Sequence, residues 1–167
     1  MQIKCIPVGY LQANCYIVSI DNKAILIDPG DEAQKIESHL NGLELVGILL
    51  THNHFDHTGA LSYFEEKYHL KHNEKIYGFS YEIIKTPGHT KDSLTFYFPE
   101  EKIMFTGDFL FKETIGRMDL PGGSVEDMKK SLELISNYDD DIIVYPGHEE
   151  KTILGEEKKL FQFYFSH

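Results

Sequence analysis

Short runs of apolar residues, each bounded by polar residues or by Gly and Pro, predict strands along the first third of the chain. The predicted strands run from Ile3 to Pro7, Asn14 to Ser19, Ala24 to Ile27 and Leu45 to Leu50. The last of these is apolar without interruption, as in strands buried on both faces, and such a strand needs a layer on each side of its sheet. Helices are predicted from Asp31 or Glu32 to Leu40, ended by Asn41-Gly42, and from Thr58 to Lys67.

The alternation of strands and helices continues after residue 80. Further strands are predicted from Tyr81 to Lys85, Ser93 to Phe98, Lys102 to Phe105 and Ile142 to Tyr145. Ser124, with Asp127 three positions later, resembles a capping box and predicts a helix that ends near Ser136. A final amphipathic helix is predicted from Leu154 to Tyr164. Strands with helices on both sides predict an α/β or α+β sandwich.

Composition favours an ordinary globular protein of one domain. The chain has 167 residues, of which 41% are hydrophobic and 26% charged. No apolar run approaches the roughly 18 residues of a membrane helix, and Pro7 and Gly9 interrupt the apolar start that a signal peptide would need. Cys5 and Cys15 are too few for a disulfide framework, so we expect two packed thiols in a reducing cytoplasm.

Charge narrows the range of partners. The formal net charge is −11, which repels nucleic-acid phosphates and anionic membrane surfaces. The sequence therefore predicts neither nucleic acid nor a membrane as partner. Arg117 is the only arginine among 16 basic residues, which favours a role in which a planar guanidinium is needed.

The stretch after the buried strand carries the strongest chemical signal. His52, His54, Asp56 and His57 form the pattern H-x-H-x-D-H within six residues. Imidazole is a favoured ligand of zinc and iron. In a tight loop the first two histidines face one point and the following Asp-His pair faces a second, so one loop can begin two adjacent metal sites. Each site needs further ligands from elsewhere in the chain.

Three more candidates each follow a predicted strand and a glycine: His89, Asp108 and His148. Glycine allows a sharp turn that directs the next side chain into a crevice at the carboxyl ends of the strands. The remaining histidines fit no such junction and are expected at the surface or the terminus: His39, His69, His72 and His167.

These motifs resemble the metallo-β-lactamase-fold hydrolases along nearly the whole chain. The stretches Leu26-Ile27-Asp28-Pro29-Gly30 and Gly116-Arg117-Met118-Asp119-Leu120-Pro121-Gly122-Gly123 extend the resemblance to the glyoxalase II-like branch. The resemblance implies a four-layer αββα sandwich as a single compact domain over residues 1–167, without the C-terminal helical domain of full-length glyoxalase II. It also implies two divalent ions, with Zn as the expected metal and Fe or Mn as alternatives. The first ion would be held by His52, His54 and His89, the second by Asp56, His57 and His148, with Asp108 bridging them.

The activity implied by this resemblance is hydrolysis of a small acyl thioester, of the hydroxyacylglutathione kind, by a metal-bound hydroxide. Asp56 and Asp108 are the candidate catalytic residues. Lys112 and Arg117 are candidates for binding a substrate carboxylate, although a salt bridge from Arg117 to Asp119 explains that arginine equally well. Asp28 is expected either to accept the far ring N–H of a ligating histidine or to cap a turn.

Two other functions fit the same residues. A persulfide dioxygenase-like enzyme would hold one iron with His52, His89 and Asp108, and a non-catalytic metal-binding protein would use the same ligands. The segment from Tyr68 to Ser80 is short for the strand and helix that commonly occupy this place in the resembling enzymes. We therefore expect a reduced pocket wall and a free strand edge, and a homodimer paired through that edge is one arrangement that follows.

Overall fold

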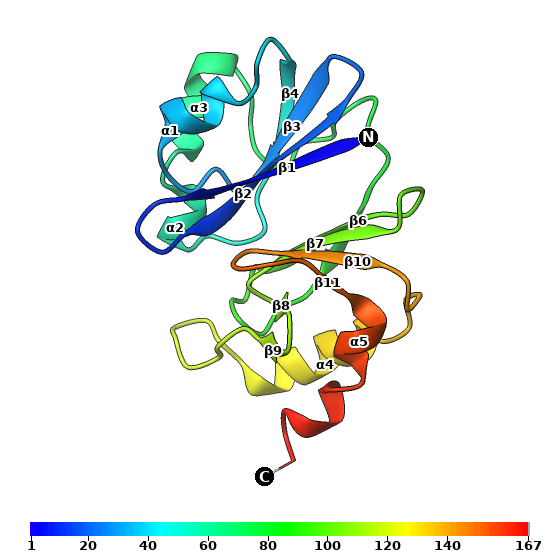
Figure 1. Cartoon of the computed structure of the whole chain (residues 1–167). Helices are drawn as coiled ribbons and strands as arrows, with labels where there is room; N and C mark the ends of the chain where they lie inside the picture. The colour runs from blue at the N-terminus through cyan, green and yellow to red at the C-terminus, as the bar shows by residue number, and fades with distance from the viewer. Residues whose placement is uncertain (167) are drawn as a thin grey trace. The chain divides into compact units, whose positions relative to one another are not determined.

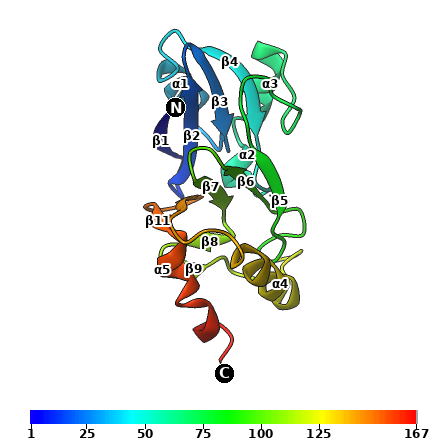
Figure 2. The ribbon, with the colours of Figure 1, turned by 90° about the vertical axis from the view of Figure 1, so that its right-hand side faces the viewer.

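The computed structural model describes residues 1–166, and it divides into two compact units, Met1–Ser80 and a second unit that begins at Tyr81. Each unit holds its own sheet with helices beside it (Figures 1 and 2). Among the described residues, no helix is long and apolar enough to cross a membrane.

The first unit is built on a four-stranded sheet with the order β1-β2-β3-β4. The strands are β1 (Gln2–Val8), β2 (Ala13–Ile20), β3 (Lys23–Ile27) and β4 (Glu44–Leu49), and the helices are α1 (Ala33–Ser38), α2 (Phe55–Thr58) and α3 (Leu61–Tyr68). The first three strands are antiparallel neighbours, whereas β3 and β4 are parallel. Ile36 of α1 and Phe64 of α3 pack with alternate strand residues such as Ile17 and Leu26 in one core. Residues of the opposite sheet face, such as Val18 and Ile25, are fully buried as well.

The second unit contains a five-stranded sheet with the order β11-β10-β7-β6-β5 and a small hairpin of β8 and β9. Its strands are β5 (Glu82–Lys85), β6 (Leu94–Phe98), β7 (Ile103–Gly107), β8 (Leu110–Phe111), β9 (Thr114–Ile115), β10 (Ile143–Pro146) and β11 (Thr152–Ile153). Its helices are α4 (Val125–Ile135), α5 (Leu154–Lys158) and the 3₁₀ turn η1 (Phe161–Phe163). Met128 and Leu132 of α4 pack with Met104 and Val144 in the core of this unit.

Most predicted elements are confirmed with shifts of one or two residues at their ends. Ser124 accepts a hydrogen bond from the backbone N–H of Asp127, as the capping pattern predicts. The prediction of one helix from Leu154 to Tyr164 is wrong, because α5 ends at Lys158. The backbone hydrogen bonds that follow, such as Leu160 N–H to Glu157 O, reach only three residues back. The helix predicted from Thr58 to Lys67 corresponds to α3, which begins three residues later, and the short helix α2 before it was not predicted. The three two-residue strands were not predicted, because so short a segment has no period.

The cysteines and the histidines outside the motifs follow the sequence predictions in part. Cys15 is buried in the core, but Cys5 is exposed, so the expectation of two packed thiols is wrong for Cys5. His69 and His72 are exposed, and His39 is half-buried. His167 lies outside the described residues.

The segment between α3 and β5 partly covers the outer edge of β4. His72 forms an isolated parallel bridge with Ile48, and the Asn73 side chain bonds both the N–H and the C=O of Leu50. Ile76 packs over Gly47, where an added Cβ would lie 2.2 Å from Ile76 Cδ1. The free edge expected from the short segment is therefore partly occupied by the chain itself. A homodimer stays a prediction.

Candidate metal centre

In the first unit, parallel pairing brings the ends of β3 and β4 together. Asp28 follows β3 and Thr51 follows β4, and the Asp28 N–H donates to Leu49 O at 3.0 Å. Asp28 lies in the left-handed region with φ of 53°, a conformation that Asp tolerates better than most residues, and its side chain is turned toward the loop after β4. The H-x-H-x-D-H loop therefore begins against a buried carboxylate.

A chain of hydrogen bonds connects two of the imidazoles through Asp28. Its Oδ1 accepts from Thr51 N–H at 2.7 Å, and its Oδ2 accepts from Thr51 Oγ1 at 2.6 Å and lies 2.8 Å from His57 Nδ1. Thr51 Oγ1 in turn lies 2.9 Å from His52 Nδ1. Since the threonine hydroxyl donates its proton to Asp28, it accepts one from the His52 ring.

These contacts decide which ring nitrogen carries the proton. The Asp28 carboxylate can only accept, so His57 holds its proton on Nδ1, and the same reasoning applies to His52. In a neutral imidazole this leaves the lone pair on Nε2, which is the arrangement of a metal-ligating histidine with an oriented far nitrogen. Asp28 itself has a ligand atom within 4.8 Å of those of His52 and His57. Both of its oxygens already accept hydrogen bonds, so we assign it an orienting contact rather than a ligand position.

The other two members of the motif lie beside these rings. The His54 ring makes an edge contact with the His52 ring at a centroid separation of 4.9 Å. Asp56 Oδ2 lies 3.4 Å from His57 Nε2. Cys15 adds no ligand, because burial and the nearby Asp28 carboxylate raise the pKa of its thiol well above the usual range.

In the second unit, strand direction explains why three ligand candidates share one edge. The parallel strands β7 and β10 end beside each other, and Gly147 N–H donates to Gly107 O at 2.8 Å. Strand β5 runs in the same direction, because it is antiparallel to β6 and β6 is antiparallel to β7. Asp108, His148 and His89 therefore follow strand ends on the same side of the sheet.

The glycines before these residues make two of the three turns. Gly107 has φ of 53° and Gly88 has φ of 146°, and a Cβ on Gly88 would lie 2.6 Å from Met128 Cα. The chain also bends at Gly147, but there the turn does not need positive φ. A Cβ on Gly116 would lie 1.8 Å from Asp108 O and 3.1 Å from His89 Cβ, so the chain after β9 packs directly against two candidate ligands.

The Asp108 carboxylate lies midway between two imidazoles. Its Oδ2 is 3.5 Å from His89 Nε2 and 3.5 Å from His148 Nε2. His89 Nδ1 lies 2.8 Å from the backbone oxygen of Arg117, which can only accept, so His89 also keeps its lone pair on Nε2. His89 is buried and His148 is about one quarter exposed at its side chain.

The separations between ligand candidates fit a metal ion. In a tetrahedral site with metal–ligand distances of about 2.0–2.1 Å, two ligand atoms lie roughly 3.3–3.5 Å apart. The pairs Asp56–His57, Asp108–His89 and Asp108–His148 all lie at 3.4 to 3.5 Å. Direct N–H···O hydrogen bonds are shorter, at about 2.7–3.2 Å. Each unit therefore presents imidazole nitrogens and carboxylate oxygens at separations that suit two ligands of the same metal ion.

The two residues predicted to bind substrate make ion pairs in this structure. Lys112 Nζ lies 2.7 Å from Glu150 Oε1. Arg117 forms a two-pronged contact with Asp119, with Nε–Oδ1 and Nη2–Oδ2 both at 2.7 Å, and this contact lowers the pKa of Asp119 to about 2. The salt bridge is the alternative that the sequence left open for Arg117. A substrate contact of either cation stays a prediction.

Sequence reasoning missed Thr51 and Glu157. Thr51 connects Asp28 to His52, and its position immediately before the motif was the available signal. Glu157 is 1% exposed and accepts from Glu113 N–H at 2.8 Å and Thr152 Oγ1 at 2.6 Å. It ties the β8–β9 hairpin, which follows Asp108, to β11, which follows His148. It was not found because it lies among charged residues that look solvated.

Comparison with known proteins agrees with this ligand chemistry. A model of the metallo-β-lactamase superfamily matches residues 8–72 and 73–148. The chain belongs to the metallo-β-lactamase superfamily. The two sheets with their helices are thus the mixed α/β architecture of the metallo-β-lactamase fold, as the sequence predicted, and members of this superfamily bind divalent metals. The face-to-face order of the four layers stays a prediction.

Similar proteins include hydrolases and metal-bound structures. Hydroxyacylglutathione hydrolase GloC of Haemophilus influenzae is 32% identical, over 95% of this chain and 96% of that protein. The crystal structure of the B3 metallo-β-lactamase BLEG-1 matches with a TM-score of 0.92 at 28% identity, over 99% of this chain and 100% of the other. The structure of TTHA1623 in a di-iron-bound form matches with a TM-score of 0.83 at 30% identity, over 92% and 96% of the two chains.

The alignments place a shortening in this chain. The alignment with GloC spans 203 positions, which exceeds the 167 residues available here. The match to the superfamily model is interrupted between residues 72 and 73. This is the segment in which the structure has a single bridge residue, His72, beside β4.

Proposed function

We propose that this superfamily member is a glyoxalase II-like hydrolase that cleaves an acyl thioester with two divalent ions held by seven residues. The ligands would be His52, His54, Asp56, His57, His89, Asp108 and His148. The observation that carries the proposal is the proton placement: His52, His57 and His89 each donate from Nδ1 to an oxygen, and so hold the lone pair on Nε2. The di-iron-bound relative and GloC support two ions and a thioester respectively.

The residues that hold or orient the ions' ligands have defined tasks in this proposal. When bound, divalent ions supply an acidified water and polarise the substrate carbonyl. Asp28 and Thr51 hold the His52 and His57 rings in one tautomer and one orientation. Asp56, with 14% of its side chain exposed, accepts a hydrogen bond from the attacking water and so orients it. Asp108 lies where one carboxylate contacts ligands on both sides, His89 and His148.

A thioester suits a site that offers no obvious proton donor to the leaving group. A thiolate leaves without strong protonation, because free thiols have a pKa near 8.5. The two candidate cations that follow Asp108 in the chain form ion pairs, Lys112 with Glu150 and Arg117 with Asp119. Thioester cleavage would therefore need neither of these cations as a proton donor.

Thioester hydrolysis by metal-reconstituted protein tests the proposal. We expect release of thiol from S-lactoylglutathione or acetyl thioesters, and we expect His57→Ala to lower kcat by at least a hundredfold. The control is His69→Asn, at an exposed histidine with φ of 53° that Asn tolerates. Absence of turnover across a thioester panel with fully metal-loaded protein would overturn the proposal.

The same samples separate the rival oxygenase. A persulfide dioxygenase that uses His52, His89 and Asp108 consumes oxygen with glutathione persulfide and needs one iron. Measurement of oxygen uptake with iron-loaded protein distinguishes the two reactions. Thiol-dependent oxygen consumption without thioester cleavage would assign the oxygenase in place of the hydrolase.

A further inference from the structure

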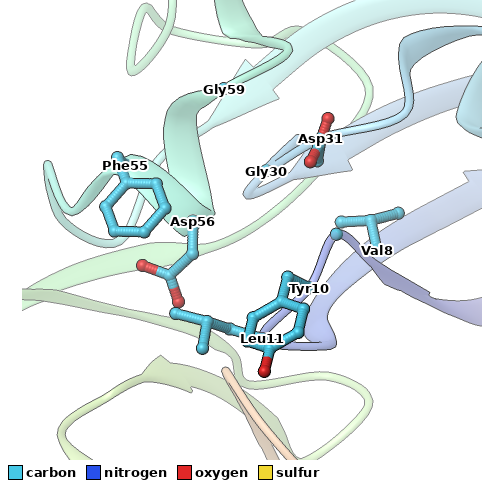
Figure 3. Close-up of a pocket in the computed structure, with 9 residues that line it drawn as sticks. Val8, Tyr10, Leu11, Gly30, Asp31, Phe55, Asp56 and Gly59 are labelled. Carbon is cyan, nitrogen blue, oxygen red and sulfur yellow. The ribbon is translucent and has the colours of Figure 1, made fainter.

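A small apolar pocket lies beside Asp56 within the first unit. It has a volume of about 270 Å³, and the turn between β1 and β2 forms one wall while the start of α2 forms the other. Val8, Tyr10, Leu11 and Phe55 provide its apolar side chains. In Figure 3, the Asp56 carboxylate is drawn between Phe55 and Leu11.

Three of the four apolar side chains of this pocket are exposed, whereas Val8 is buried in the core. Tyr10 is 98% exposed, Phe55 76% and Leu11 48%. A cluster of large apolar residues that faces water is informative, because scattered exposed residues are common whereas a grouped set marks a binding surface. The three exposed side chains of Tyr10, Leu11 and Phe55 are therefore candidates for a binding surface.

The turn that carries Tyr10 and Leu11 is held at its base. Gln12 N–H donates to Gly9 O at 3.2 Å, and Gly9 N–H donates to Glu32 Oε2 at 2.9 Å. Lys35 Nζ donates to Pro7 O at 2.7 Å just before the turn. The two side chains are thus presented from a fixed backbone, which lowers the entropy lost when a ligand binds against them.

The position of Asp56 decides which ligand the pocket takes. The same carboxylate lines the pocket and lies 3.4 Å from His57 Nε2, among the proposed ligands. An occupant of the pocket would therefore lie beside the reacting carbonyl, the carbon to which the acyl chain of a thioester is attached. Of the two charged residues in the lining, Asp56 is a proposed metal ligand, whereas Asp31 is not, and the Asp31 carboxylate disfavours an acyl group that ends in a carboxylate.

We propose that this pocket binds a neutral, apolar acyl chain, and that the enzyme prefers such thioesters over hydroxyacyl and carboxyacyl ones. This inference rests on the thioester hydrolase function proposed above. At roughly 30 Å³ for each water-sized group, the pocket holds on the order of nine such groups, which accommodates a chain of about six carbons. Burial of each methylene favours binding about fourfold, so an acyl chain lengthened from two to six carbons gains at least tenfold in kcat/KM even when only half of it is buried.

The experiment compares acetyl, lactoyl, hexanoyl and glutaryl thioesters of one thiol, N-acetylcysteamine. We expect kcat/KM for hexanoyl to exceed that for acetyl by at least tenfold, with lactoyl and glutaryl no better than acetyl. Leu11→Ala should lower the hexanoyl-to-acetyl ratio about tenfold, while Leu11→Met, which conserves volume, should retain most of it. The control is Tyr77→Ala, an exposed aromatic of the same unit outside the pocket, which should leave the ratio unchanged.

The possible results separate this inference from the proposed function. Turnover of all four thioesters with equal kcat/KM, or a ratio unaffected by Leu11→Ala, overturns the pocket assignment while thioester hydrolysis stands. If no thioester is cleaved, the proposed function fails. Binding of the S-hexyl thioether of N-acetylcysteamine, measured directly, then tests whether the pocket takes an apolar chain. Binding that Leu11→Ala weakens supports an apolar ligand site, and binding that this variant leaves unchanged overturns it.

Discussion

Replacement of Asp28 by Asn tests the hydrogen-bond chain on which the first half of the metal site depends. Asp28 is 1% exposed, and its two oxygens accept three hydrogen bonds, two from Thr51 and one from the His57 ring. Asn keeps the shape but has only one acceptor oxygen. With the amide oxygen left on Thr51 N–H, the amide NH₂ faces the Thr51 hydroxyl and His57 Nδ1.

The ring must then accept at Nδ1, so its proton moves to Nε2 and blocks the nitrogen that would bind metal. Loss of such an outer partner typically costs 10–100-fold in metal affinity, or about 1.4–2.7 kcal/mol. The metal-dependent gain in the free energy of unfolding should fall by the same amount. Competition with a chromophoric chelator measures the affinity, and ¹⁵N NMR of the imidazoles reports the tautomer of His57 directly.

Asp21→Asn is a matched control, because Asp21 is exposed and has nearly the same backbone conformation, with φ of 54° against 53° for Asp28. It should bind metal as tightly as the wild type. The reasoning is refuted if Asp28→Asn binds metal with unchanged affinity although the proton of its His57 has moved to Nε2. Retention of the Nδ1–H tautomer in this variant would show that Asp28 does not set it.

Two further predictions concern stability. Glu157→Ala removes the buried acceptor of the Glu113 N–H, so the free energy of unfolding in urea should fall by about 2–3 kcal/mol. The control Glu156→Ala, at an exposed position, should change it by less than about 0.5 kcal/mol. Equal losses in the two variants would mean that the buried hydrogen bonds are unimportant. Hydrogen bonds led by that from Lys67 lower the pKa of Glu37 to about 2 from 4.5. A lowered carboxyl pKa stabilises the fold above the unfolded value, and this is lost as pH falls from about 4.5 to about 2. Unfolding free energies of Glu37→Gln and the wild type should therefore differ more at pH 6 than at pH 3, and a constant difference would contradict the assignment.

The sequence predicted the parts of the fold in which local pattern and burial agree. The apolar run from Leu45 to Leu50 specified β4, and the Ser124–Asp127 spacing specified the start of α4. The candidate ligands could be named because ligand residues repeat at strand ends, where parallel strands deliver them to one edge. For Asp28, the sequence predicted a contact with the ring of a ligating histidine as one of two roles, but not which histidine.

Other features depend on contacts that no local pattern records. The break after Lys158 follows from backbone bonds that reach three residues back, in a segment whose apolar spacing looks like one helix. Glu157 looks solvated in sequence because charged residues surround it, yet it is buried by the hairpin that it holds. The pocket at Tyr10 and Leu11 arises from a turn anchored to Glu32, more than 20 residues away in the chain.

Metal stoichiometry tests the central claim most directly, since the proposal assigns two ions to the seven candidate ligands. Elemental analysis of zinc- or iron-loaded protein should give two ions per chain for the wild type. Asp108→Ala and His57→Ala should each lose at least one ion, and His69→Asn should keep both. Two tightly bound ions in both Asp108→Ala and His57→Ala would contradict the account.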